Sequence, residues 1–221
     1  MRGIVDEEKE YYSLTIRVWR RLAPFYDLVT KPFLSKLRDQ VVDFAKASKG
    51  SRILDVATGT GEQALAFARR SYEVVGVDLS EDMLRVAKRK NRFGNARFEL
   101  ADATSLPFED GSFEATCISF ALHDMPLSTR EKVLKEMVRV TKPKGMVVIV
   151  DYGLPKGKVG KFLVYHFVKL YEGEYYSRFI KSDLVALLRK TGIEIMEELP
   201  VLLGAVRILK GTKNGAQRPG D

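Results

Sequence analysis

Short apolar runs alternate with amphipathic segments through the middle of this chain, a pattern typical of repeated strand–helix units. Such units join by right-handed crossovers, so they build a parallel sheet with helices on both faces. Two further apolar runs follow a last amphipathic segment and are expected to complete the sheet. The seven predicted strands cover residues 52–56, 73–77, 96–100, 113–120, 146–150, 193–199 and 203–210.

Segments rich in aromatic side chains stand on both sides of this pattern. Residues 6–46 repeat apolar positions at intervals of three and four, and Pro24 and Pro32 are expected to divide them into separate helices. A second aromatic segment interrupts the strand–helix order at 152–180. The tail, 211–221, is polar and glycine-rich, and we expect it to be disordered. The remaining residues, 1–210, are expected to form a single domain.

Composition limits the function classes. Hydrophobic residues make up 45% and charged residues 30% of the 221, which is typical of a globular domain. The chain has no apolar run long enough to span a bilayer and no apolar core of a signal peptide at its amino end. We therefore expect a cytoplasmic protein with no stable membrane insertion. The single cysteine, Cys117, and two distant histidines argue against a disulfide and against a catalytic metal.

The charge of the chain leaves several partners to consider. A formal net charge of +8 and an isoelectric point near 9.5 would suit RNA or an anionic membrane surface. Lysine and arginine are interleaved with acids, however, which favours an ordinary solvated surface. RNA therefore stays open as a partner but is not favoured, DNA is not expected, and a homodimer is left open.

Acids and glycines follow successive predicted strands. The first strand carries Asp55 and breaks into the turn 57–61, where Gly59 and Gly61 let the backbone approach a ligand because glycine has no Cβ. The second strand ends in Asp78, a carboxylate suited to a ribose. Since the carboxyl ends of parallel strands meet at one edge of a sheet, the pattern predicts a nucleoside site.

A dinucleotide-binding enzyme is the alternative interpretation of this turn. The spacing Gly59-x-Gly61-x-x-Ala64 also satisfies the fingerprint of nicotinamide and flavin enzymes. Asp55 lies within the strand before the glycines, and Asp102, after the third strand, has no role in that fingerprint. These two acids favour a different nucleoside ligand.

The chain resembles class I S-adenosylmethionine-dependent methyltransferases, in particular the ubiquinone/menaquinone biosynthesis type and its small-molecule relatives. The resemblance implies a Rossmann-like α/β fold: a seven-stranded, mostly parallel sheet with a terminal antiparallel strand and an N-terminal helical lid. It also implies S-adenosylmethionine as methyl donor, S-adenosylhomocysteine as product, no metal, and a small-molecule or lipid-like acceptor. The matching segments are Leu54–Gly61, Gly76–Leu84, Ala101–Phe108, Leu122–Asp124, Lys142–Gly145 and Ala23–Asp27.

The resemblance assigns the methionine part and the ribose of the donor to the first two strand ends. Gly59 and Gly61, with Asp55 and the main chain of Ala57-Thr58, would hold the ammonium and carboxylate groups, and Asp78 would accept both ribose hydroxyls. Many members have Gly-Cys at the positions of Ala57-Thr58. Alanine is small enough there if its φ is negative, so we expect binding to be retained.

The adenine and the sulfonium are assigned to later strand ends. Leu79 and Met83 would face the adenine, which needs an apolar slot. Asp102 would accept the adenine amino hydrogens, while the Ala103 N–H meets a ring nitrogen. Phe120, at the end of the fourth strand, would lie beside the sulfonium.

The acceptor site is less specified. In this superfamily, segments such as 1–46 and 152–180 form a lid over the acceptor, and Tyr26 matches a residue close to the cofactor. His123 could act as a general base or orient the acceptor; alternatively, it hydrogen-bonds the loop before Pro126 or contacts the cofactor through its backbone. Two other functions stay open, an RNA-directed methyltransferase and a non-catalytic S-adenosylmethionine-binding partner subunit.

Overall fold

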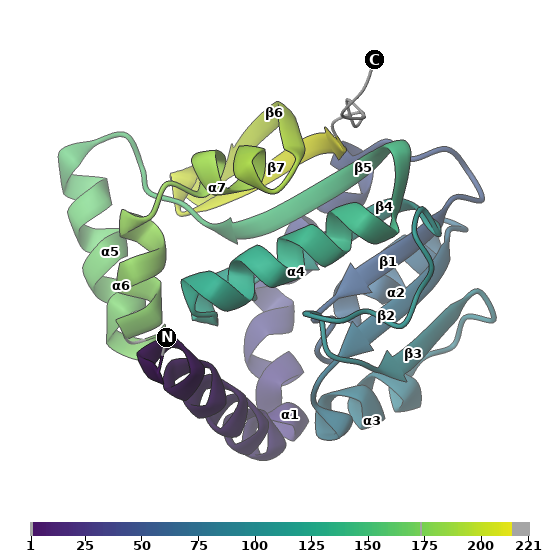
Figure 1. The fold of residues 1–221 in the computed structure, drawn as a ribbon, viewed down its shortest axis with the longest axis horizontal. Helices are drawn as coiled ribbons and strands as arrows, with labels where there is room; N and C mark the ends of the chain where they lie inside the picture. Colours follow the sequence, from purple (N-terminus) through teal and green to yellow (C-terminus); the bar gives the residue numbers. More distant parts are fainter. Residues whose placement is uncertain (1, 173, 214–221) are drawn as a thin grey trace.

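The computed structural model describes residues 2–172 and 174–213, which contain one seven-stranded sheet in the order β3-β2-β1-β4-β5-β7-β6 (Figure 1). Strands β1 to β5 pair in parallel, and β7 runs antiparallel between β5 and β6. The expected fold class is thereby confirmed. The strands are β1 (Arg52–Val56), β2 (Glu73–Asp78), β3 (Ala96–Leu100), β4 (Phe113–Ser119), β5 (Thr141–Tyr152), β6 (Ile193–Val201) and β7 (Val206–Lys213).

Strand residues divide alternately between two hydrophobic clusters, one on each face of the sheet. Leu54 and Ile149 belong to the cluster that packs against α4 (Leu127–Val140). Their neighbours Ile53 and Val148 belong to the cluster under α2 (Glu62–Arg69) and α3 (Glu81–Lys90), which the end of α1 also joins. Because side chains of a strand alternate in direction, both faces of these central strands are buried.

Helix α1 (Arg2–Ala45) corrects one expectation. The helix continues through Pro24 and Pro32, so the prediction of separate helices is wrong. Figure 1 shows that α1 changes direction between its two halves: the first lies at one end of the molecule, and the second passes behind the sheet. A proline removes one helical hydrogen bond and favours a bend, and here the chain bends without leaving the helix.

The aromatic segment at 152–180 forms two helices, α5 (Lys158–Glu172) and α6 (Glu174–Lys181), and α7 (Leu184–Lys190) follows them. Two short 3-10 turns complete the fold, η1 (Leu122–Asp124) after β4 and η2 (Leu202–Gly204) between β6 and β7.

The end of β7 moves one predicted boundary. Residues 211–213 were expected in a disordered tail, but Gly211 and Thr212 pair with Val147 and Met146 of β5. The ladder to a buried strand thus fixes these residues; 214–221 lie outside the described residues. Within the described ranges, no helix combines the length and the hydropathy that a membrane span requires.

Candidate functional site

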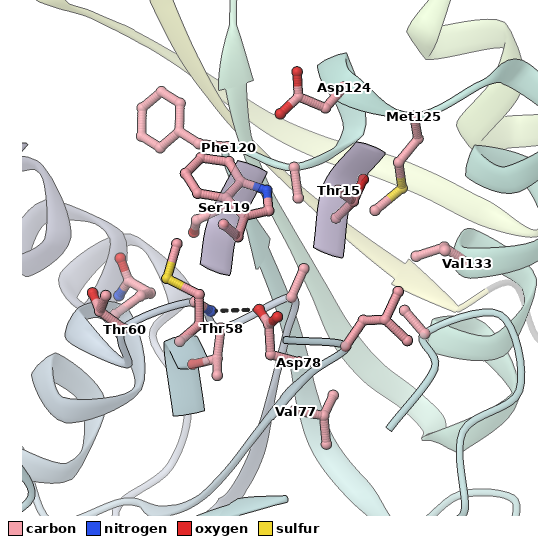
Figure 2. A pocket seen from close by; sticks show the side chains of 18 of the residues that line it. Thr15, Thr58, Thr60, Val77, Asp78, Ser119, Phe120, Asp124, Met125 and Val133 are labelled. Carbon is pink, nitrogen blue, oxygen red and sulfur yellow. Dashed lines mark hydrogen bonds between the residues drawn. The ribbon is translucent and has the colours of Figure 1, made fainter. Parts of the chain in front are cut away.

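A cavity lies at the carboxyl ends of β1, β2 and β4, where α1 crosses the edge of the sheet (Figure 2). The loops after these strands contribute most of its polar groups, and α1 contributes aromatic side chains. Three predicted site residues, Asp55, Gly61 and His123, are not among the residues that line it. The ten predicted residues that do line it are Tyr26, Ala57, Thr58, Gly59, Asp78, Leu79, Met83, Asp102, Ala103 and Phe120.

The carboxylate of Asp78 joins the loops after β1 and β2. The Gly59 N–H donates to its Oδ2 at 2.7 Å (Figure 2). The Ser80 N–H donates to its Oδ1 at 2.9 Å. Burial raises the pKa of Asp78, although these main-chain N–H groups oppose the shift. In the described part of the chain, its hydrogen-bond donors are main-chain groups; since Asp78 lines the cavity, its remaining acceptor capacity is available to a ligand.

Two non-glycine residues of the cavity wall have left-handed backbone conformations. Ala57 has φ +53°, which contradicts the expectation of a negative value, and Phe120 has φ +51°. Main-chain bonds hold both turns: the Thr58 N–H donates to the Val77 oxygen at 2.9 Å, and the Phe120 N–H to the Val150 oxygen at 2.8 Å. Such strain persists where the surroundings enforce it, typically at functional sites.

Asp55 supports the cavity from behind. Its side chain is 1% exposed, and the Thr58 hydroxyl donates to its Oδ2 at 2.5 Å. Burial raises its pKa to about 7, while the Thr58 bond and the Arg38 charge oppose the shift. Gly61 has φ +79° and begins α2; an added Cβ would lie 2.7 Å from the Phe98 ring. Both residues shape the loop, and their direct contact with a ligand stays a prediction.

Asp102 is tied to α1 by Tyr12, a contact the sequence did not indicate. The Tyr12 hydroxyl donates to Asp102 Oδ2 at 2.9 Å, and the N–H and hydroxyl of Thr104 donate to Oδ1 at 2.8 Å each. Burial, together with the bond to Asp102, raises the pKa of Tyr12. The carboxylate therefore fastens the first half of α1 over the loop after β3.

The two aromatic segments contribute differently. Tyr11, Tyr12, Trp19 and Tyr26 of α1 line the cavity, with the Trp19 and Tyr26 rings edge to face at 5.5 Å. Burial raises the pKa of Tyr11, and the Asp124 charge adds to this. No described side chain of α5 or α6 lines the cavity. The expectation that the segment at 152–180 covers the acceptor stays a prediction.

His123 lies behind the cavity, between two carboxylates. Its Nδ1 is 2.8 Å from Asp151 Oδ1, and its Nε2 is 3.6 Å from Asp124 Oδ1. His123 is buried against the Tyr152 ring, whereas Asp124 lines the cavity. Asp124, the next residue in the segment Leu122–Asp124, is thus the one that a ligand in the cavity can reach. Residues 2–172 and 174–213 contain no group of three or more His, Cys, Asp or Glu side chains that could hold a metal ion.

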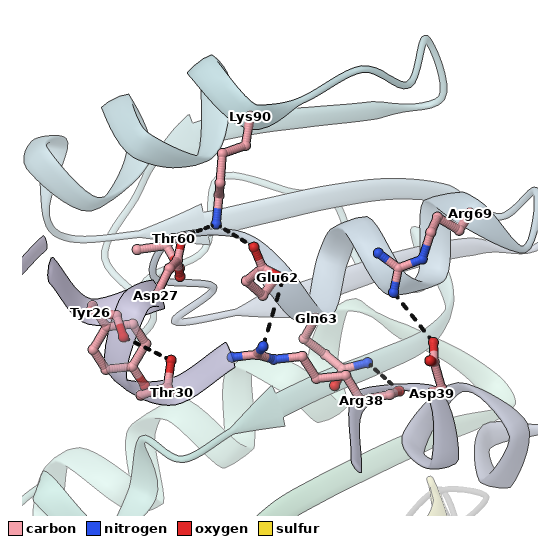
Figure 3. Close-up of polar contacts among 10 residues, drawn as sticks. All are labelled: Tyr26, Asp27, Thr30, Arg38, Asp39, Thr60, Glu62, Gln63, Arg69 and Lys90. Atoms are coloured by element: carbon pink, nitrogen blue, oxygen red, sulfur yellow. Dashed lines mark hydrogen bonds and ion pairs between the residues drawn. The ribbon is translucent and has the colours of Figure 1, made fainter. Parts of the chain in front are cut away.

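A charge network holds the bend of α1 against the loop after β1 (Figure 3). The Lys90 ammonium bridges Asp27 of α1 and Glu62 of α2, the latter at 2.7 Å. The Thr60 hydroxyl donates to Asp27 Oδ1 at 2.5 Å, and Arg38 Nη1 lies 3.7 Å from Glu62 Oε2. The network connects α1, α2 and α3 around one corner of the cavity.

Arg38 is a cavity residue that no sequence motif marked. It lines the cavity at 8% exposure, and its Nη1 makes no hydrogen bond with the described residues. The ion pair of this Nη1 with Glu62, at 3.7 Å, is too long for a hydrogen bond, so a donor remains for an anionic ligand group. Its place on the buried face of α1, next to Leu37, was the only signal in the sequence.

A family model described as "Methyltransferase domain" matches residues 53–145. A demethylmenaquinone methyltransferase from Renibacterium salmoninarum is 42% identical over 139 residues, 61% of this chain and 56% of that protein. This chain thus spans little more than half the length of that relative. A demethylmenaquinone methyltransferase from Thermotoga maritima is 32% identical over 200 residues, 83% of this chain and 86% of the relative.

A solved structure of similar fold is a SAM-dependent methyltransferase from Methanosarcina mazei. It covers 78% of this chain and 97% of its own, with a TM-score of 0.61 and 21% identity. At this identity the likeness supports the fold.

Asp55 is expected to make stability depend on pH. Because its folded pKa of about 7 exceeds its ordinary value of 3.8, the folded chain binds more protons between these values, and stability falls as pH rises through them. Asp55→Asn removes the buried charge, so the stability of this variant relative to wild type should rise by a few kcal/mol from pH 4 to pH 8, since one pKa unit corresponds to about 1.4 kcal/mol. Urea unfolding at each pH measures this; a constant difference, as expected for the exposed control Asp43→Asn, would contradict it.

Lys90→Met is expected to loosen α1. The substitution removes the cation shared by Asp27 and Glu62, and breaking a partly buried pair favours opening. Limited proteolysis should cleave within α1 about tenfold faster, since cleavage follows the open population. The control is Lys88→Met, an exposed lysine on the same helix. Equal cleavage rates in the two variants would show that the network does not hold the helix.

Proposed function

We propose, since this chain belongs to the demethylmenaquinone methyltransferase family, that it transfers a methyl group from S-adenosylmethionine to a quinone-like acceptor. The observation that carries the proposal is the half-buried Asp78 carboxylate, which lines the cavity and is held by two main-chain N–H groups. S-adenosylmethionine, when bound, supplies a methyl group that its sulfonium has already activated.

The polar groups of the cavity fit the sugar and the amino acid part of this donor. Asp78 can accept hydrogen bonds from both hydroxyls of a ribose, one per oxygen. Arg38 can neutralise the methionine carboxylate with its unused Nη1 donor, which lies buried at the cavity wall. The left-handed turn at Ala57 and Gly59 brings main-chain groups to the same wall.

The remaining wall of the donor site fits an adenine. Leu79 and Met83 offer apolar surface, and Met83 is held by the bond from its N–H to the Ser80 hydroxyl at 3.3 Å. The main chain of Ala103 lies beside them in the lining. Asp102 is already bonded to Tyr12, so an adenine amino group would share this carboxylate with the tyrosine.

The acceptor would occupy the part of the cavity near Thr15, Asp124, Met125 and Val133, which Figure 2 shows away from Thr60. Apolar side chains there suit a flat ring, and Tyr11 adds an aromatic face. The relatives named for demethylmenaquinone support a quinone-type acceptor. We infer methylation at a ring carbon of its quinol form, with the hydrogen of that carbon leaving as a proton afterwards so that the aromatic ring is restored.

We assign to Asp124 the role of the base that removes a proton from the acceptor. Loss of a hydroxyl proton raises the electron density of the ring, which makes a ring carbon a better nucleophile, and a carboxylate on the cavity wall can take that proton. His123 would act through Asp124 as a positioning residue, since it lies between Asp124 and the buried Asp151. In this assignment His123 is not the base that touches the acceptor.

Helix α1 would act as the lid. Its aromatic side chains line the cavity, and its bonds through Tyr12 and Asp27 fasten it to the loops that follow β3 and β1. Alignment of donor and acceptor and exclusion of water supply most of the rate in a transfer of this kind.

Titration calorimetry tests the donor site. Wild type should bind S-adenosylhomocysteine, and Asp78→Asn should weaken binding by about tenfold or more because one charge-assisted acceptor of the ribose is lost. The exposed-surface control is Asp43→Asn, which should bind as wild type. Tight binding of NADH in place of S-adenosylhomocysteine would contradict the proposal and favour a dinucleotide enzyme.

Methyl transfer to a short-chain demethylmenaquinol tests the base. Asp124→Asn should lower kcat by about a hundredfold or more, the usual share of a general base, with S-adenosylhomocysteine affinity unchanged. His123→Asn should lower kcat less and shift the pH profile, because Asp124 stays in place. If Asp124→Asn is fully active while His123→Asn is not, the histidine is the base and the assignment is wrong.

A further inference from the structure

Helix α5 carries an exposed apolar face that the cavity does not use. Its inner side packs on α6, with Val168 buried and the Tyr165 ring 6.0 Å from the Tyr176 ring. Figure 1 shows α5 at the left-hand end of the molecule, outside α6. The exposed side chains recur at helical intervals of three and four: Val159, Phe162, Leu163, Phe167 and Leu170.

These exposures are too large and too concentrated to be ordinary surface. Phe162 is 62% exposed and Phe167 70%, and both lie on one side of a single helix with three aliphatic residues. Single exposed apolar residues need no explanation, but a contiguous apolar face marks an interaction site. We call these five residues the α5 apolar face.

A strained turn places two more leucines next to the start of α5. Leu202 and Leu203 of η2 both have positive φ, +48° and +57°, and Leu203 is 98% exposed. The turn lies against the residues that lead into α5, since a Cβ on Gly204 would be 3.2 Å from the Pro155 Cα. Left-handed backbone is energetically unfavourable for leucine, and burial of these two side chains does not offset it because both are exposed.

Lysines accompany the α5 apolar face. Residues 155–170 contain four lysines and no aspartate or glutamate, and the first acid of α5 is its last residue, Glu172. Lys156, Lys158, Lys161 and Lys169 are all exposed. An apolar helical face bordered by lysines fits the surface of an anionic bilayer, where apolar side chains enter the headgroup region and lysines meet lipid phosphates.

We propose that the α5 apolar face, with Leu202 and Leu203, docks this protein reversibly on an anionic lipid membrane. The lysines favour membranes that contain anionic lipids, and the aromatic and aliphatic side chains contact the lipid. This inference does not depend on methyl transfer, although a membrane-resident acceptor would give the docking an evident use. A second copy of the chain is the competing occupant of this face, and the lysine border disfavours it because two such faces would repel each other.

Vesicle flotation of the full chain tests the proposal. Wild type should float with vesicles of phosphatidylcholine mixed with phosphatidylglycerol, bind pure phosphatidylcholine more weakly, and lose binding as salt is added. The double substitution Phe162→Ser/Phe167→Ser should lower the partition coefficient by about tenfold or more, because two aromatic side chains no longer enter the lipid. Met196→Ser, which removes an exposed apolar side chain of β6, is the matched control and should bind as wild type.

A second pair of variants tests the charge. Lys158→Gln/Lys169→Gln should lower partition into phosphatidylglycerol vesicles by about tenfold or more and leave partition into pure phosphatidylcholine unchanged. Lys49→Gln/Lys144→Gln, two exposed lysines outside α5, is the control and should have a smaller effect. Circular dichroism and S-adenosylhomocysteine binding report whether each variant is folded.

Two results would overturn the docking proposal. The first is that wild type fails to float with either kind of vesicle, or that the Phe162→Ser/Phe167→Ser variant floats as well as wild type. The second is that analytical ultracentrifugation finds a dimer that the phenylalanine substitutions dissociate, with no vesicle binding by wild type, which assigns the face to a second copy. Failure of the wild type to bind S-adenosylhomocysteine would contradict the proposed function instead and leave a positive flotation result intact.

Discussion

The cavity depends on an ionic contact between elements far apart in the sequence: Lys90, at the end of α3, joins Asp27 of α1 to Glu62 of α2. Strand ends and loops supply the floor of the cavity, but its wall of aromatic side chains belongs to α1. That helix must therefore be held at its bend. The hydroxyl of Thr60 and the charge of Arg38 complete the contact, so that the loop after β1 and helix α1 are positioned by the same group of side chains.

The cavity also concentrates features that cost stability. Ala57 and Phe120 have left-handed backbone, and Asp55 and Asp78 are carboxylates whose pKa burial raises. Each lies where one parallel strand ends, so the central strands, buried on both faces, supply the rigidity that maintains them. Fixed donors and acceptors of this kind need little rearrangement when a ligand binds, which is what alignment of two reactants requires.

Two groups of aromatic residues lie outside the core of the sheet. Tyr11, Tyr12, Trp19 and Tyr26 of α1 line the cavity, whereas Phe162 and Phe167 of α5 are exposed on a helix with exposed lysines. The proposed functions of the two surfaces are complementary: one encloses a flat ring, and the other holds the protein at the phase where a lipid-like acceptor would reside. Helix α6 contacts both helices: its Tyr175 ring lies 6.5 Å from the Tyr11 ring of α1, and it also packs on α5.

The sequence by itself determined the sheet and many residues of the cavity lining, because strand periodicity, glycine turns and acids at strand ends are local signals. Asp78, Gly59 and Met83 lie together for this reason. Arg38, Tyr12 and Asp124 entered the site through the path of α1 and the packing of η1, which depend on contacts between residues many positions apart. Only the tertiary structure could decide that α1 continues through its prolines, that His123 lies behind Asp124, and that α5 turns its apolar face outward. Periodicity marks which residues share a face, but what that face meets is set by the packing of the whole chain.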